Sequence, residues 1–347
     1  MAELGEFGLI AELSRWLPPD PRALVGIGDD AAVLAVPDGR VVATTDFLLE
    51  GRHFRRDWSS ARDVGHKAAA RSLADVAAMG GVPTALLVAL AAPPDLPVRW
   101  ARELAAGLAA ECARVHPPAS VVGGDTARAD AVLLAVTALG DLAGRPPVLR
   151  GGAVPGDVVA VAGPLGHAAA GLALLSAGLG GGDPSWASLV TAQLRPAPPY
   201  DAGPEAAALG AHAMIDVSDG LLADLGHIAD ASGVQVDVDS AAAWPAAPLP
   251  EAARAVQMAG PNSSFSRTSR GIPPEHADAD GLAQGLAQRL ALRWVLTGGE
   301  DHSLVATFPP SVTLPPRWRV IGAVREGGGV AVDQTPWAGD TGWNHFA

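Results

Sequence analysis

The chain has 347 residues, 49% of them hydrophobic and 18% charged, and this length is typical of two domains of ordinary size. Its formal net charge of -13 argues against a protein that binds nucleic acid or an anionic membrane, because such proteins need a basic surface. The single cysteine, Cys112, excludes an internal disulfide and a cysteine-based zinc cluster. Anionic substrates remain compatible with this charge where cations bridge them to the protein.

The N-terminal segment has the pattern of a helix rather than of a targeting signal. It lacks a basic region and a small-residue cleavage site. Its apolar residues recur instead at helical spacing, at Leu4, Phe7, Ile10, Leu13 and Leu17. No uninterrupted apolar stretch has the length of a membrane span. We therefore expect a soluble, cytoplasmic protein with no membrane partner.

Lysine is nearly absent from the sequence, and this excludes several kinase architectures. Lys67 is the only lysine, and it does not lie in the G-x-x-x-x-G-K-[ST] pattern of a P-loop. The catalytic-loop and D-F-G motifs of protein kinases are absent as well. If the chain handles nucleotides, it uses another architecture.

The first half alternates predicted strands and helices. In order, we expect a strand at 39–51, a helix from about 61 to the glycines at 80 and 81, a strand at 84–94 and a helix at 98–115. Residues 120–142 are expected to form two strands joined by a Gly-Gly-Asp turn at 123–125. A boundary is expected near 145–156, where proline, glycine and arginine gather.

The second half repeats the alternation of strand and helix. We expect a strand at 157–163, a turn and helix at 164–179, and a strand, acidic turn and helix at 212–233. Residues 250–285 are rich in proline, serine and alanine, and the stretch 259–281 within them has no clear periodicity, so we expect a loop or insertion there. Such alternation in both halves favours an α/β or α+β protein.

The informative acids are those that interrupt apolar segments. They are Asp29, Asp30, Asp46, Asp75, Asp125, Asp216, Asp219, Glu300 and Asp301. Nearly all lie at predicted strand ends beside glycine or a hydroxyl residue, where a scaffold presents functional groups. Oxygen ligands suit hard cations such as Mg²⁺, whereas the absence of a cysteine cluster or H-E-x-x-H disfavours zinc. Divalent cations carrying phosphates are therefore the expected compensation for the adjacent pair Asp29 and Asp30.

Each acid also has a purely structural interpretation. Aspartate beside glycine is common turn chemistry. Ser218 and Asp219 could cap a helix that begins at Leu221. Asp75, in the middle of a predicted helix, could pair with Arg71 four residues earlier. The occurrence of all these acids together favours the functional interpretation.

The motifs in their order resemble those of the thiamine-monophosphate kinases, a family in the superfamily of aminoimidazole ribonucleotide synthetase and selenophosphate synthetase. They are GEFGLI (5–10), GDDAAV (28–33), TTDFLLEGRHF (44–54), KAAARSLADVAAMGGVP (67–83), VVGGDT (121–126), RGGAVPGD (150–157), GPLGHAAAGL (163–172), IDVSDGL (215–221), LTGGEDHSL (296–304) and GWNHF (342–346). The resemblance implies ATP-dependent phosphorylation of thiamine monophosphate to thiamine diphosphate, the last step of thiamine diphosphate biosynthesis. It implies ATP as co-substrate and several Mg²⁺ ions.

The resemblance also implies a two-domain aminoimidazole ribonucleotide synthetase-like fold. We expect an N-terminal α/β domain over 1–148 that binds metal and ATP and forms a homodimer through its sheet. A C-terminal α+β domain over 149–347 would complete the nucleotide and substrate site. The expected partners are thiamine monophosphate and ATP, with no nucleic acid.

Motif positions imply the site residues. Metal ligands are implied at Asp30, Thr44, Thr45, Asp46, Asp75, Asp125, Asp216 and Asp219. Nucleotide contacts are implied at Gly124, Asp125, Arg150 and Ser218. Substrate contacts are implied at His53, Glu300 and Trp343, with Trp343 offering an aromatic face to the cationic thiazolium. The residues implied to be catalytic are Asp30, Asp75, Asp125 and Asp219.

The implied reaction needs charge neutralisation more than it needs a base. Two polyanions must meet, and metal ions offset their repulsion. The nucleophile is a phosphate oxygen with a second pKa of about 6, so it is largely ionised near neutral pH. We therefore expect direct transfer without a phosphoenzyme.

Two departures from the family pattern, and two alternatives, accompany this interpretation. His302 and Ser303 stand where the family has Tyr and Glu, and Ala109 stands near the position of a helical aromatic. These departures concern adenine contacts and affinity rather than the metal-binding acids. One alternative is another ATP-using enzyme of the superfamily, although a selenium enzyme would carry a reactive Cys or selenocysteine near its N-terminus. The other is a degenerate nucleotide-binding protein.

Overall fold

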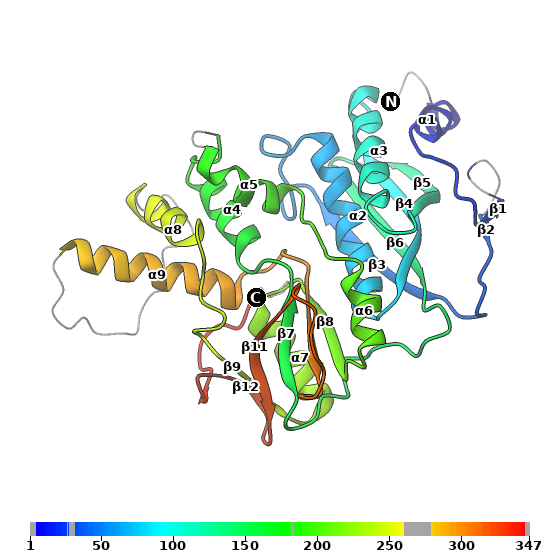
Figure 1. Cartoon of the computed structure of the whole chain (residues 1–347). Helices are drawn as coiled ribbons and strands as arrows, with labels where there is room; N and C mark the ends of the chain where they lie inside the picture. The colour runs from blue at the N-terminus through cyan, green and yellow to red at the C-terminus, as the bar shows by residue number, and fades with distance from the viewer. Residues whose placement is uncertain (1–4, 26, 28–31, 182–183, 260–278, 344–347) are drawn as a thin grey trace. The chain divides into compact units, whose positions relative to one another are not determined.

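The structure is a computed structural model that describes the chain except residues 1–4, 26, 28–31, 182–183, 260–278 and 344–347. The chain forms two compact units, shown in Figure 1. Unit 1 comprises residues 1–149 and 198–211, and unit 2 comprises 150–197 and 212–347. The main division therefore lies one residue beyond the expected one at 148/149.

The segment 198–211 is the part of the chain that the expected domains assign differently. The sequence places it in the second domain, whereas in the structure it packs within unit 1. Tyr200 Oη donates a hydrogen bond to the buried carboxylate of Glu111 at 2.6 Å. The helix α6 (Ala202–Ala208) also packs closely, because a Cβ on Gly203 would lie 2.0 Å from the Ala77 carbonyl oxygen. These contacts connect distant parts of the sequence, and local patterns do not reveal them.

Unit 1 is built on a four-stranded sheet of order β3-β6-β4-β5, in which β4 and β5 are parallel. Its elements are α1 (Gly5–Ser14), β1 (Ala23–Val25), β2 (Val33–Leu34), β3 (Val42–Leu49), α2 (Ala61–Ala78), β4 (Val82–Ala92), α3 (Val98–Cys112), β5 (Ser120–Arg128), β6 (Leu133–Asp141) and α6. The predicted helix after residue 60 is confirmed. Ser60 caps α2 in a reciprocal capping box with Asp63.

The two faces of this sheet differ because side chains alternate along each strand. On β3, Thr44, Asp46 and Leu48 lie on the face that α2 covers, and the alternate residues are exposed. Phe47 is 56% exposed and pairs in register with Ala135 of β6. Unit 1 therefore presents an apolar outer face, which we define by Phe47, Leu49, Leu87, Ala89, Leu133 and Ala135.

The predicted Gly-Gly-Asp turn is wrong. Residues 123–125 lie inside β5, and the chain turns at 129–132 instead. A Cβ on Gly124 would lie 2.0 Å from the carbonyl oxygen of Val88 on β4. Gly124 therefore permits the close approach of two strands, which a local sequence pattern cannot distinguish from a turn.

Unit 2 is built on a seven-stranded sheet of order β13-β12-β9-β11-β7-β10-β8. Neighbouring strands are antiparallel except β9 and β12, which are parallel. The elements are β7 (Val158–Ala162), α4 (His167–Ser176), η1 (Pro184–Trp186), α5 (Ala187–Leu194), β8 (Ala213–Val217), α7 (Leu221–Ser232), β9 (Gln235–Val238), α8 (Leu249–Met258), α9 (Ala279–Thr297), β10 (Ser303–Phe308), β11 (Trp318–Arg325), β12 (Gly329–Val332) and β13 (Thr335–Pro336).

The expectation of a loop over 250–285 is wrong at both of its ends. Helix α8 covers 249–258, and α9 begins at residue 279. Leu249, Ala252, Ala253 and Val256 are buried at helical spacing, so tertiary burial decides a segment whose composition is ambiguous. Residues 260–278 lie outside the described part.

The hydrophobic core of unit 2 lies between its sheet and its helices. Strands β8 and β10 are buried along their whole lengths. The apolar face of α7, with Leu221, Leu225 and Ile228, belongs to this core. Among the described helices, none combines the length and hydropathy that crossing a membrane requires.

Candidate active site

Four oxygen-bearing side chains meet between β3 and α2 in unit 1. Thr44 Oγ1 donates to Asp75 Oδ2 at 2.7 Å, and Ser72 Oγ donates to Asp46 Oδ2 at 3.1 Å. Strand alternation directs Thr44 and Asp46 toward α2, and the three-residue spacing of Ser72 and Asp75 places them on one helix face. We call Thr44, Asp46, Ser72 and Asp75 the first acid cluster.

Positive charge lies close to the first acid cluster. Arg71 Nη2 is 4.0 Å from Asp46 Oδ1. Asp75 receives its hydrogen bond from Thr44 on the neighbouring strand, so it is more than the partner of a simple salt bridge along its helix. The single lysine, Lys67, is buried and donates to the carbonyl of His53 at 3.2 Å. It thereby fixes the loop that follows β3.

Thr45 and Asp125 do not join the first acid cluster. Thr45 accepts a hydrogen bond from Thr137 Oγ1 at 3.2 Å on the outer face of the sheet. Asp125 of β5 lies opposite Ala89 of β4, and Ala89 lies opposite Ala135 of β6. Ala135 in turn lies opposite Phe47 of β3, so Asp125 is on the same outer face as Phe47. Because the period of a strand is two, Thr44 and Thr45 point to opposite sides. Asp30 lies outside the described residues.

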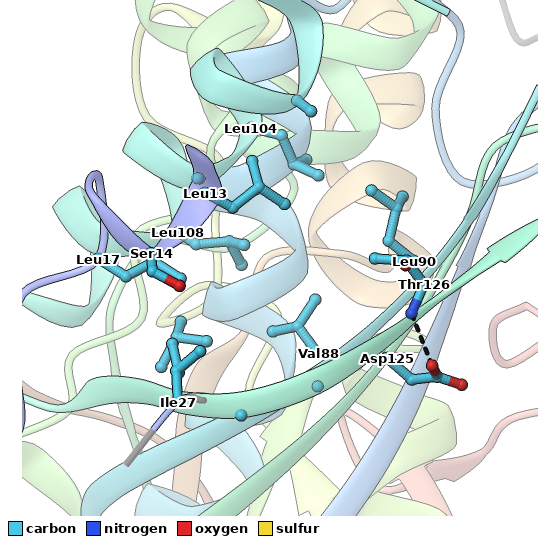
Figure 2. Close-up of a pocket in the computed structure, with 15 residues that line it drawn as sticks. Leu13, Ser14, Leu17, Ile27, Val88, Leu90, Leu104, Leu108, Asp125 and Thr126 are labelled. Atoms are coloured by element: carbon cyan, nitrogen blue, oxygen red, sulfur yellow. Dashed lines mark hydrogen bonds between the residues drawn. The ribbon is translucent and has the colours of Figure 1, made fainter. Parts of the chain in front are cut away.

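A pocket of ≈ 100 Å³ lies beside Asp125, enclosed by α1, α3 and the strands β4 and β5 (Figure 2). Figure 2 shows that leucine side chains of α1 and α3 form its apolar walls, while the Asp125 carboxylate points away from them and accepts the Thr126 N–H at 2.8 Å. Gly124 contributes to the lining through its backbone. Sequence reasoning missed Leu13 of α1 and Leu17 just after it, because nothing in the local pattern links these residues to β5.

His53 has a defined tautomer in the structure. The Leu49 N–H donates to His53 Nδ1 at 3.0 Å. A ring nitrogen that accepts a hydrogen bond carries no proton, so the proton of the neutral ring sits on Nε2. His53 is half-buried in the loop after β3.

In unit 2, the loop 218–220 between β8 and α7 is held from inside the protein. Asp224 Oδ2 accepts the N–H groups of Ser218, Asp219 and Gly220 at 3.1, 3.2 and 3.1 Å. The alternative that Ser218 or Asp219 caps α7 is therefore wrong, because the cap residue is Gly220 and makes no side-chain bond. Burial, together with repulsion from Asp216 and Asp219, raises the pKa of Asp224 to about 8. Sequence reasoning missed Asp224, although an acidic residue in the first turn of an otherwise apolar helix was a usable signal.

The loop 298–302 lies directly against the loop 218–220. Glu300 N–H donates to the Ser218 carbonyl at 2.8 Å, and His302 N–H donates to the Val217 carbonyl at 2.8 Å. A Cβ on Gly299 would lie 2.4 Å from the Ser218 carbonyl oxygen, so glycine permits this approach. The sequence Gly-Gly-Glu-Asp is thus explained by the packing of two loops.

Asp301 in the same loop faces the interior. Its carboxylate accepts the N–H of Gly166 at 2.5 Å and of Ala168 at 2.8 Å, at the first turn of α4. Burial raises the pKa of Asp301 to about 7, and these hydrogen bonds oppose that rise. Asp301 therefore serves α4 as a cap supplied by a remote loop.

Trp343 joins this group through its backbone. Its N–H donates to the Asp219 carbonyl at 2.8 Å, while its side chain is 60% exposed. The structure thus brings together Ser218, Asp219, Glu300 and Trp343 of the expected site. Arg150 is exposed, and its carbonyl accepts from Ser232 Oγ at 3.2 Å.

The two residues that depart from the family pattern are both buried. His302 Nδ1 lies 3.0 Å from Asp216 Oδ2, and Ser303 Oγ donates to the Pro164 carbonyl at 2.5 Å. The expectation that this departure leaves the metal-binding acids untouched is therefore wrong, because His302 contacts Asp216, one of the acids expected to bind metal. The second departure from the family pattern is Ala109, and its neighbour in sequence, Leu108, lines the pocket of unit 1.

The donor chemistry of both units fits a hard cation. The first acid cluster and the pair Asp216 and Asp219 offer carboxylate and hydroxyl oxygens. Within the described ranges, no three His, Cys, Asp or Glu side chains come close enough to hold a metal ion by themselves. Mg²⁺ usually binds through one or two carboxylates together with waters and substrate phosphates, so such sparse groups are compatible with it.

Comparison with known proteins first gives the class of the chain. Residues 28–142 match the N-terminal domain of the AIR synthase related proteins, and residues 154–261 match their C-terminal domain. The chain is therefore a two-domain AIR synthase related protein with mixed sheets and helices.

Full-length relatives define the family within this class. The thiamine-monophosphate kinase of Mycobacterium tuberculosis (strain CDC 1551 / Oshkosh) is 44% identical, over 100% of this chain and 93% of its own. The crystal structure of thiamine-monophosphate kinase from Stenotrophomonas maltophilia K279a has a TM-score of 0.74 and 32% identity, over 96% of this chain and 98% of that one. A solved structure described as AaThiL complexed with AMPPCP and TMP has a TM-score of 0.72 and 32% identity, over 100% and 98%. The chain belongs to the thiamine-monophosphate kinase family.

Proposed function

We propose that this chain phosphorylates thiamine monophosphate to thiamine diphosphate with ATP as the phosphoryl donor. The observation that carries the proposal is the 44% identity to a thiamine-monophosphate kinase along the whole chain. A similar solved structure is described as a complex with AMPPCP and TMP, which supports the same pair of ligands here. The relatives that share this architecture along the whole chain thus support the same reaction for it.

The metal ligands that we propose come from both units. In unit 1 they are Thr44, Asp46 and Asp75 of the first acid cluster, with Asp30. Thr45 and Asp125 remain proposed ligands, but they lie on the opposite face of the sheet and would not hold an ion at that cluster. In unit 2 they are Asp216 and Asp219. When bound, Mg²⁺ neutralises the charge of the phosphates and holds their oxygens in line. The hydrogen bonds from Thr44 and Ser72 preorganise the carboxylates of Asp75 and Asp46 for this task.

The remaining site residues bind and orient the two substrates. We propose Gly124, Asp125, Arg150 and Ser218 as nucleotide contacts, and His53, Glu300 and Trp343 as contacts of thiamine monophosphate. The Nε2–H of His53 is a donor that suits an anionic group, and the exposed indole of Trp343 suits a cationic ring. The acceptor phosphate is largely ionised at neutral pH, with a second pKa of about 6. We therefore propose direct transfer without a general base or a phosphoenzyme.

The proposed oligomer is a homodimer formed through the sheet of unit 1. The outer face carries Phe47, 56% exposed, and Leu49, 37% exposed, beside other apolar side chains on neighbouring strands. Exposed apolar faces of this kind mark interaction surfaces. A second copy of the same face is complementary to it in chemistry, and paired sheets bury both.

The function is tested by incubating the purified chain with ATP, Mg²⁺ and thiamine monophosphate. ADP release and thiamine diphosphate are followed together by chromatography. We expect one diphosphate for each ADP, a reaction that stops on chelation, and little ADP without thiamine monophosphate. ATP binding without any product would contradict the proposed reaction and favour a degenerate nucleotide-binding protein.

A further inference from the structure

We propose that His302 is a positioning residue that donates its Nδ1–H to Asp216 and so fixes the carboxylate that serves as a metal ligand in unit 2. The role of Asp216 rests on the proposed function. The hydrogen bond itself does not, because it joins two residues of this chain at 3.0 Å without any ligand. With Oδ2 occupied by the ring, Oδ1 is the oxygen that a cation would take.

The backbone holds both partners in place. His302 N–H donates to the Val217 carbonyl at 2.8 Å, directly after Asp216 on β8. Antiparallel pairing continues from there, with Ser303 opposite Val217 and Leu304 opposite Asp216. His302 has φ of 51°, in a left-handed region that histidine tolerates better than most residues. The imidazole therefore reaches Asp216 from a fixed strand end.

The chemistry of the pair requires a donor at position 302. His302 is 2% exposed, and the side chain of Asp216 is 7% exposed, so water has little access to either. An ionised carboxylate only accepts hydrogen bonds, and a buried one without a donor is costly. The ring nitrogen that faces Asp216 must therefore carry a proton, which in a neutral ring defines the Nδ1–H tautomer.

The surroundings of Asp216 increase this need. Asp216 and Asp219 both lie close enough to Asp224 to disfavour its charged form, so a further acid lies near Asp216. Asp224 is itself occupied by the N–H groups of the loop 218–220. A donor on Oδ2 offsets part of the repulsion and holds one rotamer of Asp216. His302 thus orients the carboxylate of Asp216, as hydrogen-bond partners outside the ligand shell orient metal ligands in general.

The first test measures the tautomer in the metal-free protein. Two-bond ¹H–¹⁵N spectra of histidine-labelled chain report which ring nitrogen carries the proton, and the signal of residue 302 is assigned by its loss in His302→Asn. We expect Nδ1–H for His302. A ring protonated on Nε2 alone would overturn the proposal without reference to any activity.

The second test separates the donor from the shape of the side chain. His302→Asn keeps an N–H donor near the position of Nδ1, whereas His302→Leu has similar size and no donor. We expect His302→Leu to weaken Mg²⁺ binding by about 10- to 100-fold, the usual effect of losing an outer partner of a ligand. We expect His302→Asn to stay near the parent value. His227→Asn, on the exposed side of α7, is the matched control.

Binding is read by calorimetric titration with Mg²⁺ in the presence of a non-hydrolysable ATP analogue, and thermal unfolding of the metal-free variants shows that they are folded. Equal Mg²⁺ affinity in the Asn and Leu variants would overturn the positioning role. The two proposals can fail separately. If the parent chain makes no thiamine diphosphate, but His302→Leu alone among the variants binds Mg²⁺ more weakly than the parent, the proposed function is overturned and the positioning role stands.

Discussion

At the scale of single residues, the structure explains why a carboxylate is tolerated in the middle of an apolar helix. Asp75 faces β3, where Thr44 donates to it at 2.7 Å. Asp46 on the same strand has a hydroxyl donor in Ser72 and a guanidinium 4.0 Å away in Arg71. Each buried or half-buried acid is thus matched by a donor from a different element, which lowers the cost of its charge.

Asp75→Asn tests the proposed role of the first acid cluster. The amide oxygen can still accept from Thr44, so the thermal midpoint should change by little. Turnover should fall by at least ~10²-fold, because a preorganised charge that acts on the transferring group is removed. Initial rates and a thermal melt check both statements. Asp130→Asn, an exposed acid of unit 1, is the control; near-parental activity in Asp75→Asn would remove Asp75 from the site.

At the scale of elements, buried acids accept hydrogen bonds from N–H groups at helix N-termini whose capping residues have no side-chain acceptor. The helix α4 begins after Gly166, which has no side chain, and Asp301 of a remote loop accepts N–H groups of its first turn. In the helix α7, the acid is its own Asp224, which accepts N–H groups of the loop 218–220 just before the helix. Both carboxylates have raised pKa values because burial disfavours their charge.

Asp301 predicts a pH dependence of stability. Its pKa is about 7 in the folded chain, against about 3.9 when unfolded, so the folded state keeps the proton longer. The free energy of unfolding should therefore decrease as pH rises from 4 to 7, by an amount on the order of a few kcal/mol. Urea unfolding at several pH values measures this.

The matched variant for this prediction is Asp301→Asn. It loses one N–H acceptor, so its stability at pH 4 should be lower by about 1–3 kcal/mol. The decrease between pH 4 and 7 should be smaller than in the parent, because the group that titrates is gone. Asp230→Asn, exposed on α7, should keep the parental slope; an unchanged slope in Asp301→Asn would contradict the assignment.

Glycines at two places should respond oppositely to alanine. Gly124→Ala forces a Cβ to within 2.0 Å of the Val88 carbonyl oxygen, so β4 and β5 must separate. We expect a loss of about 1–3 kcal/mol in unfolding free energy. A methyl group on Gly285 in α9 would meet no atom within 4 Å, so Gly285→Ala should stabilise the chain by about 0.5–1 kcal/mol. Denaturant midpoints of the two variants test the contrast.

At the scale of the whole molecule, the chain returns from unit 2 to unit 1 and leaves again. Residues 198–211 lie with unit 1, where Glu111 accepts from Tyr200 at 2.6 Å, from Arg114 at 2.6 Å and contacts His66 at 2.9 Å. This buried network connects α2, α3 and the returning segment. The two units are therefore not independent stretches of sequence, although each has its own sheet.

The proposed homodimer predicts a mass of twice the 35.0 kDa chain. Phe47→Asp places a charge on the apolar outer face and should produce a monomer, because a desolvated charge opposes association. Light scattering after size exclusion measures the mass. Val320→Asp, at an exposed position of unit 2, should leave the dimer intact; a monomeric parent chain would contradict the proposal.

The positions of several proposed site residues on strands, helices and turns were predictable from the sequence, but their groupings were not. Strand and helix periods indicated the strand of Asp46, the helix of Asp75 and the acidic turn before α7. The predicted strand already places Thr44 and Thr45 on opposite faces, but the sequence did not show which of the two faces α2 covers. It did not distinguish the glycine of a turn from Gly124 inside a strand, because both need a residue without a side chain.

The sequence by itself determined the family, the alternation of strands and helices, and the oxygen-rich chemistry of the site, because each of these is written in local patterns and in the order of motifs. Only the tertiary structure decided which acids share a face, that Asp301 holds the first turn of α4, and that His302 meets Asp216. These facts depend on contacts between residues far apart in the chain. Burial, rather than local propensity, selects them.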